Sequence, residues 1–168
     1  VIEYDFTADK LNLPEFECPD NYTPKAYIEK LCLDRLEEIQ YKITNPFQYV
    51  DRLYEELDVI DDLGFSSYFL IMKDIVDHVV ESGYLVGYGR GSASGCLVAY
   101  LLGITRTDPI KYGLLFARFL SYERKGSTPD IDLDFESGEG RDCAFNYTLN
   151  KYGADHCAAV STFSIRKA

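Results

Sequence analysis

The heptapeptide PDIDLDF, at residues 129–135, restricts the possible fold more than any other stretch of this chain. Aspartate and apolar residues alternate in it, and a β-strand points successive side chains to opposite faces. The alternation therefore predicts a half-buried strand with carboxylates on one face and apolar side chains in a core. The carboxylates are those of Asp130, Asp132 and Asp134. The apolar side chains are those of Ile131, Leu133 and Phe135.

Three like charges on one face of a strand call for a counter-charge. Alternate side chains stand roughly 6 to 7 Å apart, so the carboxylates repel one another unless solvent or a cation lies between them. Mg²⁺ accepts a few carboxylates together with water and substrate phosphates, and neighbouring aspartates on a strand offer such a partial shell. An exposed polar face on an edge strand is the alternative, and the heptapeptide alone leaves both interpretations open.

Length and composition set wide bounds. The chain has 168 residues, of which 46% are hydrophobic, and this suits one domain or a domain with an appended helical segment. We expect a cytoplasmic protein that does not enter a membrane, because no apolar run approaches about 18 residues and the first ten residues do not resemble a signal peptide. Five cysteines without C-x-x-C spacing indicate free thiols. His78 and His156 lie far apart in sequence, which favours structural roles for both.

The negative charge is concentrated in the first part of the chain. Residues 1–65 contain 16 Asp and Glu against 6 Lys and Arg, whereas residues 66–168 contain 12 against 11. Tight nucleic-acid binding needs clustered Lys and Arg. A net charge of −11 therefore argues against tight nucleic-acid binding by this chain alone, although it is compatible with acidic residues that hold metal ions.

Start and stop signals predict several helices and two short strands. Proline follows a capping residue at Thr23 and at Asn45, which predicts helices from about 24 to 41 and from 46 to a stop at Gly64. Further helices are expected at 66–82, 94–102 and 141–152, with strands at 84–86 and 157–163. We therefore expect a helical lead-in segment at residues 1–64 and an α/β (α+β) domain at residues 65–168.

A glycine-rich turn, VGYGRGSASGCLVAY at residues 86–100, is the second feature with chemical meaning. Its glycines permit tight turns and a close approach of the backbone to a ligand, and a helix that follows would favour an anion at its N-terminus. Arg90 adds a positive charge, and Ser92 and Ser94 add hydroxyls. The segment matches neither GxxxxGK[ST] nor GxGxxG. It indicates either a phosphate-binding loop or a tight connection between a strand and a helix.

The glycine-rich turn and the aspartates are more informative together than apart. A nucleotidyl-transfer site needs one part that holds a triphosphate and another that holds the metal ions bridging its oxygens. An anion-binding turn followed by a strand with aligned carboxylates supplies both parts.

The chain also resembles, from about residue 57 to its end, the bacterial replicative DNA polymerases of family C, the alpha subunits of DNA polymerase III. The resemblance lies in five segments that occur in this order: LDVIDDLGFSSYFLIMKDIV, VGYGRGSASGCLVAYLLGIT, DPIKYGLLFARFL, TPDIDLDF and KYGADH. It implies a partial palm domain related to the nucleotidyltransferase fold of polymerase beta. It also implies that Asp130 and Asp132 are catalytic residues that hold two Mg²⁺ ions. Asp134 belongs to the same motif, and its role is left open between a further metal ligand and a support of the first two aspartates.

The same resemblance implies the residues that bind the incoming nucleotide. Gly91 and Ser92 match a segment that contacts the triphosphate in the family. Arg118, in LLFARFL, matches an arginine that approaches the triphosphate, and its alternative is a surface cation on a short helix. Arg90 is expected to stabilise the turn or to face the phosphates. The turn departs from the family pattern two residues before Arg90, where Tyr88 stands in place of the usual proline.

The function implied for the full-length subunit is template-directed addition of deoxynucleotides to a primer 3′ end. Its partners would be primer-template DNA, deoxynucleoside triphosphates, the sliding clamp and other replicase subunits. A third catalytic aspartate of the family lies downstream of the segments matched here, so we expect these 168 residues alone to be inactive. Two alternatives remain: a nucleotidyltransferase that works without a template, and a noncatalytic module whose acidic helices bind a partner.

Overall fold

A computed structural model describes residues 14–124 and 128–158 of the chain. Five α-helices are α1 (Pro24–Ile39), α2 (Pro46–Asp62), α3 (Ser66–Glu81), α4 (Leu97–Leu101) and α5 (Gly138–Tyr152). Short 3-10 helices are η1 (Pro19–Asn21), η2 (Gln40–Lys42), η3 (Gly91–Gly95), η4 (Phe116–Arg118), η5 (Tyr122–Arg124) and η6 (Ala154–His156). No helix in the described ranges is long and apolar enough to cross a membrane.

The helix boundaries follow from local capping. The Thr23 side chain accepts a hydrogen bond from the Ala26 amide at 3.3 Å, which satisfies one of the free amides at the start of α1. Gly64 ends α2 with a φ of +79°, a conformation that glycine adopts without steric cost. The Ser137 side chain caps α5 by accepting from the Gly140 amide, so this helix starts three residues earlier than predicted. The predictions for the first three helices are confirmed to within a few residues.

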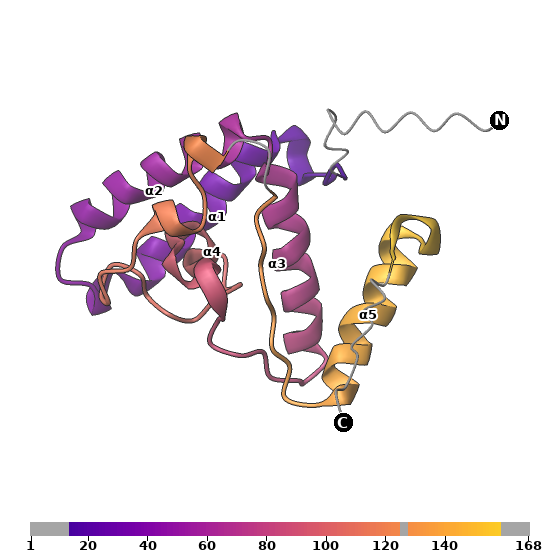
Figure 1. Cartoon of the computed structure of the whole chain (residues 1–168). Helices are drawn as coiled ribbons and strands as arrows, with labels where there is room; N and C mark the ends of the chain where they lie inside the picture. The colour runs from indigo at the N-terminus through magenta and orange to yellow at the C-terminus, as the bar shows by residue number, and fades with distance from the viewer. Residues whose placement is uncertain (1–13, 125–127, 159–168) are drawn as a thin grey trace, which may run out of the picture.

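One hydrophobic core lies among α1, α2, α3 and α4. Ile28, Leu53, Phe69 and Leu97, one from each helix, have no exposed surface. Figure 1 shows α1 and α2 side by side. Helices α3 and α4 both pack against α1. The core thus draws on residues from both sides of Gly64, and the division of the chain at that point stays a prediction.

The expected α/β (α+β) class with a partial palm is wrong. Within residues 14–124 and 128–158 the structure has no β-strand. An isolated antiparallel bridge joins Val86 to Phe135. The pairing ends there because Gly89 and Gly91 take positive φ angles and turn the chain away. The strand expected at 84–86 is therefore reduced to this bridge, and the one expected at 157–163 falls largely outside the described residues.

The PDIDLDF segment is extended but belongs to no sheet. Figure 1 shows it in orange, running beside α3. Ile131 is buried and Leu133 is partly buried against the core, whereas Asp130 and Asp134 are exposed. Ile131, buried next to exposed Asp130, follows the alternation predicted from the sequence, whereas Asp132 and Leu133 are both intermediate in exposure. The core helices supply the surface on which the segment packs.

Helix α5 docks on α3 through a partly buried polar contact. The Asp74 carboxylate accepts hydrogen bonds from the hydroxyls of Tyr147 and Tyr152 and from the Lys151 ammonium, at 2.6 to 3.1 Å. His78 stacks on Tyr147 with ring centroids 3.8 Å apart. All five cysteines are free thiols, as predicted.

Candidate active site

The glycine-rich turn folds differently from the expected strand, turn and helix. Residues 91–95 form η3, and α4 starts only at Leu97. Gly89 has a φ of +114°, and a Cβ on it would stand 3.0 Å from the Thr105 side chain. A residue with a side chain would therefore face both backbone strain and a clash at this position.

The N-terminus of α4 does not offer the expected anion site. The Val98 amide donates to the Glu56 carboxylate at 3.0 Å, and the Ala99 amide donates to the Cys96 sulfur at 3.4 Å. Side chains of the protein already satisfy these amides. An anion near the turn must therefore bind to groups other than the amides of Val98 and Ala99.

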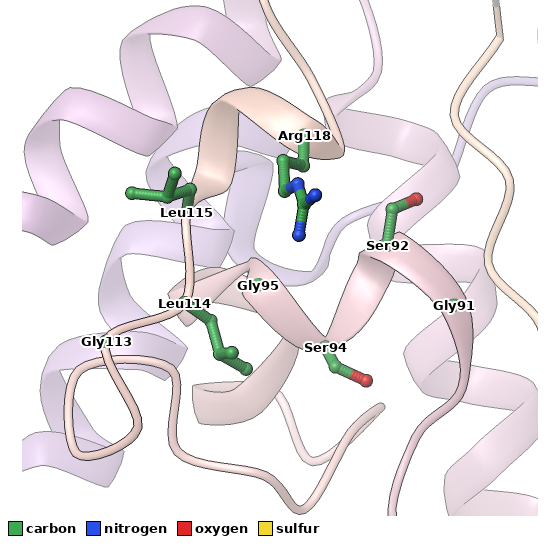
Figure 2. A pocket seen from close by; sticks show the side chains of 8 residues that line it. All are labelled: Gly91, Ser92, Ser94, Gly95, Gly113, Leu114, Leu115 and Arg118. Atoms are coloured by element: carbon green, nitrogen blue, oxygen red, sulfur yellow. The ribbon is translucent and has the colours of Figure 1, made fainter.

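A cavity of about 580 Å³ opens between η3 and the segment that leads into η4. Its lining comprises Gly91, Ser92, Ser94, Gly95, Gly113, Leu114, Leu115 and Arg118. Figure 2 shows the Arg118 side chain extending from η4 toward the turn that carries Ser92 and Ser94. The aromatic neighbours fix this helix, because Phe119 is buried and its ring contacts both Phe116 and Phe69. Three residues singled out in the sequence, Gly91, Ser92 and Arg118, thus line one cavity.

The aspartate segment lies directly beside the same turn. The Asp132 Oδ2 atom is 3.3 Å from the position of a Cβ on Gly91. Arg90 does not line the cavity but faces the carboxylates, with Nη1 3.2 Å from Asp134 Oδ1 and Nε 3.8 Å from Asp132 Oδ2. The backbone holds the two segments together, because the Gly87 amide donates to the Asp134 carbonyl at 2.8 Å.

Tyr68 is a site residue that the sequence did not reveal. It lies on α3, and its hydroxyl oxygen accepts a hydrogen bond from the Ile131 amide, between Asp130 and Asp132. Burial raises the pKa of Tyr68, and the charges of the two aspartates raise it further, whereas the Ile131 amide lowers it. In the sequence Tyr68 reads as one member of an apolar helical stripe, and only the fold shows its hydroxyl near the carboxylates.

An ion pair between a partly buried arginine and a fully buried glutamate, Arg52 and Glu56, was also missed. Glu56 has no exposed surface and accepts from the Arg52 Nε at 2.7 Å. Burial raises the pKa of Glu56, opposed by the Val98 amide and by the charge of Arg52. An acidic residue four positions after a basic one on a helix usually forms an exposed pair, so the sequence carries no signal for its burial.

The carboxylates offer an incomplete metal shell. Within residues 14–124 and 128–158, no group of three His, Cys, Asp or Glu side chains comes together in a way that could hold a metal ion. Asp130 is exposed and Asp132 is half-buried. Two accessible carboxylates fit Mg²⁺, which usually keeps several waters and binds substrate phosphates as further ligands.

Comparison with known proteins identifies the family. Residues 26–168 match the model of the bacterial DNA polymerase III alpha NTPase domain. The DNA polymerase III subunit alpha of Aquifex aeolicus is 44% identical over 160 residues, which cover 93% of this chain and 13% of that protein. The Bacillus subtilis subunit alpha is 45% identical over 160 residues, covering 95% of this chain and 14% of that protein. The chain therefore belongs to the bacterial DNA polymerase III alpha family, and it spans about one seventh of the length of these relatives.

Proposed function

We propose that this chain contributes the nucleotide-binding and metal-binding part of a replicative DNA polymerase that adds deoxynucleotides to a primer 3′ end. One observation carries the proposal. Gly91, Ser92 and Arg118 line a single cavity although Arg118 follows the turn by more than twenty residues, and Asp132 borders the same turn. A cationic side chain, a hydroxyl and nearby carboxylates are the groups that a metal-bound triphosphate requires.

The residues of the cavity would position the triphosphate. The Ser92 hydroxyl would donate a hydrogen bond to a phosphate oxygen, and the Arg118 guanidinium would offset phosphate charge. Gly91, whose φ is +67°, has no side chain, which keeps the face of the turn toward Asp132 free of a Cβ. Arg90 would act beside the cavity, by limiting the repulsion between Asp132 and Asp134.

Asp130 and Asp132 would hold Mg²⁺, with Asp134 as a support. The ions, when bound, would lower the pKa of the primer hydroxyl and stabilise charge on the phosphates. Tyr68 would keep the two carboxylates in place through the Ile131 amide. Primer-template DNA would be the further substrate, and the sliding clamp and other replicase subunits would be partners of the full-length protein. The 168 residues alone are expected to bind nucleotide without extending a primer.

Calorimetric titration with Mg²⁺ and dATP tests the proposal. The unaltered chain is expected to bind, and Asp130→Asn, Asp132→Asn and Arg118→Ala are each expected to weaken binding. Arg141→Ala is the matched control, because Arg141 is an exposed arginine on α5. Folding of each variant is checked by circular dichroism. Equal binding by all variants would contradict the assignment of these residues, and primer extension by the chain alone would contradict its expected inactivity.

A further inference from the structure

The ion pair between Arg52 and Glu56 contacts both walls of the cavity. The Arg52 Nη2 atom donates to the Gly95 carbonyl of η3 at 3.2 Å and to the Leu114 carbonyl of the opposite wall at 3.5 Å. The guanidinium also lies over the ring of Phe116, 5.9 Å from its centroid, at the start of η4. A single side chain of α2 thus connects the turn that carries Ser92 with the segment that carries Arg118.

Glu56 fixes the position of this guanidinium. One carboxylate oxygen accepts from Arg52, and the other accepts from the Val98 amide and the Cys96 thiol at 3.0 and 3.2 Å. Glu56 is fully buried, so these protein groups replace the bulk solvent around its carboxylate. A planar guanidinium held in this way can point one nitrogen at two carbonyls, which a flexible ammonium does less well.

The two walls also touch directly, so their spacing has little freedom. A Cβ on Gly95 would stand only 2.8 Å from the Leu115 carbonyl oxygen. The absence of a side chain at Gly95 therefore lets η3 lie against the segment that leads to Arg118. Arg52 bridges the walls beside this contact, because its acceptor on the opposite segment, Leu114, directly precedes Leu115.

We infer that Arg52 and Glu56 are positioning residues that set the distance between Ser92 and Arg118 in the nucleotide site. This inference rests on the proposed function, since it assigns the pair a role in the same cavity. Stability alone gives a poor account of the pair, because a buried ion pair often adds no more stability than apolar residues of similar size. Its hydrogen bonds to two separate segments supply a geometric role that apolar residues would not.

Arg52→Lys and Glu56→Gln test the inference in the 168-residue chain. The lysine keeps the charge without the planar fork, and the glutamine keeps the shape while placing an amide group toward Val98 or Arg52. Arg35→Lys is the control, because Arg35 forms an exposed pair with Glu38 on α1. The measurements are hydrogen exchange of the amides of residues 91–95 and 113–118, the affinity for Mg²⁺ with dATP, and the melting temperature.

We expect faster exchange in both segments and about tenfold weaker binding, equivalent to about 1.4 kcal/mol, in both variants of the pair. Gly95→Ala gives an independent test, because its methyl group separates the walls while the pair remains intact. It is expected to reproduce both effects.

Unchanged exchange in the two segments would overturn the inference, as would faster exchange with unaltered affinity. A uniform loss of protection across α1, α2 and α3 would also overturn it, since that result indicates a role in global stability. Absence of binding by the unaltered chain would count against the proposed function, and hydrogen exchange would still decide whether the pair holds the walls together.

Discussion

The Asp132 Oδ2 atom lies 3.3 Å from the point where a Cβ on Gly91 would stand. This is tighter than an ordinary contact, so a methyl group at Gly91 would displace the carboxylate or the turn. Gly91 also has a φ of +67°, which costs a residue with a side chain roughly 1–2 kcal/mol. Two separate penalties, one of backbone strain and one of contact with Asp132, therefore meet at this glycine.

Gly91→Ala is accordingly expected to lower the free energy of unfolding by roughly 1–2 kcal/mol and to weaken binding of Mg²⁺ with dATP. Urea denaturation and calorimetric titration measure the two effects. Gly64→Ala is the matched control, because Gly64 has a similar φ of +79° with no atom within 4 Å of the added Cβ. Equal losses of affinity in the two variants would show that strain, and not the contact with Asp132, causes the effect.

Arg90 pairs with the carboxylates that are proposed to hold a metal ion, so it would compete with that ion for them. Its guanidinium is 3.2 Å from Asp134 and 3.8 Å from Asp132, and the three side chains are 44 to 64% exposed. Replacing Arg90 by glutamine leaves the carboxylates with more negative potential and no attached cation. An exposed ion pair contributes roughly 0.2–1 kcal/mol, so the affinity for Mg²⁺ alone is expected to rise about threefold.

Titration with Mg²⁺ in the absence of nucleotide measures this change. Arg141→Gln removes the same charge at another exposed pair, with Asp142 on α5, and controls for the net charge of the protein. Weaker Mg²⁺ binding in Arg90→Gln than in Arg141→Gln would contradict competition and would indicate that Arg90 holds the carboxylates in a binding geometry.

The sequence predicted local structure well and tertiary structure poorly, for a physical reason. Thr23 and Gly64 act through the backbone of their own helices, so capping patterns located the ends of α1 and α2. The alternation in PDIDLDF reports only which side chains are buried. It carries no information on whether the backbone of the segment pairs with neighbouring strands, and the sheet was inferred without that information.

The candidate site shows the same difference between local structure, which the sequence predicts, and tertiary contacts, which it does not. The proximity of Ser92 and Arg118 was implied by resemblance to a family and not by spacing, because the segments between them fold back through contacts that no local pattern encodes. Glu56 and Tyr68 were missed because each fits the ordinary pattern of its helix. Burial of Glu56 against Val98, and contact of the Tyr68 hydroxyl with Ile131, arise only when the helices pack.

Tyr68→Phe is expected to loosen the aspartate segment while the ring keeps its place in the core. The Ile131 amide loses its acceptor, and an unsatisfied buried donor costs roughly 1–3 kcal/mol. We expect lower stability toward urea, faster exchange of the Ile131 amide and weaker Mg²⁺ binding. Tyr112→Phe, which removes an exposed hydroxyl, is the control. An unchanged affinity with reduced stability would restrict Tyr68 to a structural role.

The docking of α5 is expected to depend on pH through Asp74. Burial raises the pKa of this carboxyl, but hydrogen bonds from Lys151, Tyr152 and Tyr147 outweigh burial, and the pKa in the folded protein is lowered. A lowered pKa means that the unfolded chain binds the proton more tightly than the folded protein does. The stabilisation is therefore fully present above the ordinary aspartate pKa of about 4, and it is lost as the pH falls through the lower pKa of the folded state.

Asp74→Asn removes this dependence together with the ion pair to Lys151. At pH 7 we expect the free energy of unfolding to fall by on the order of 2 kcal/mol, since hydrogen bonds to a charged group are lost. Urea denaturation between pH 3 and pH 7 should show the difference from the unaltered chain shrinking below about pH 4. Asp77→Asn is the control on the same helix, because Asp77 pairs with Lys73 at the surface and should cost about 0.3–0.5 kcal/mol. A difference for Asp74→Asn that stays constant down to pH 3 would show that the shape of the side chain, and not its charge, holds α5 against α3.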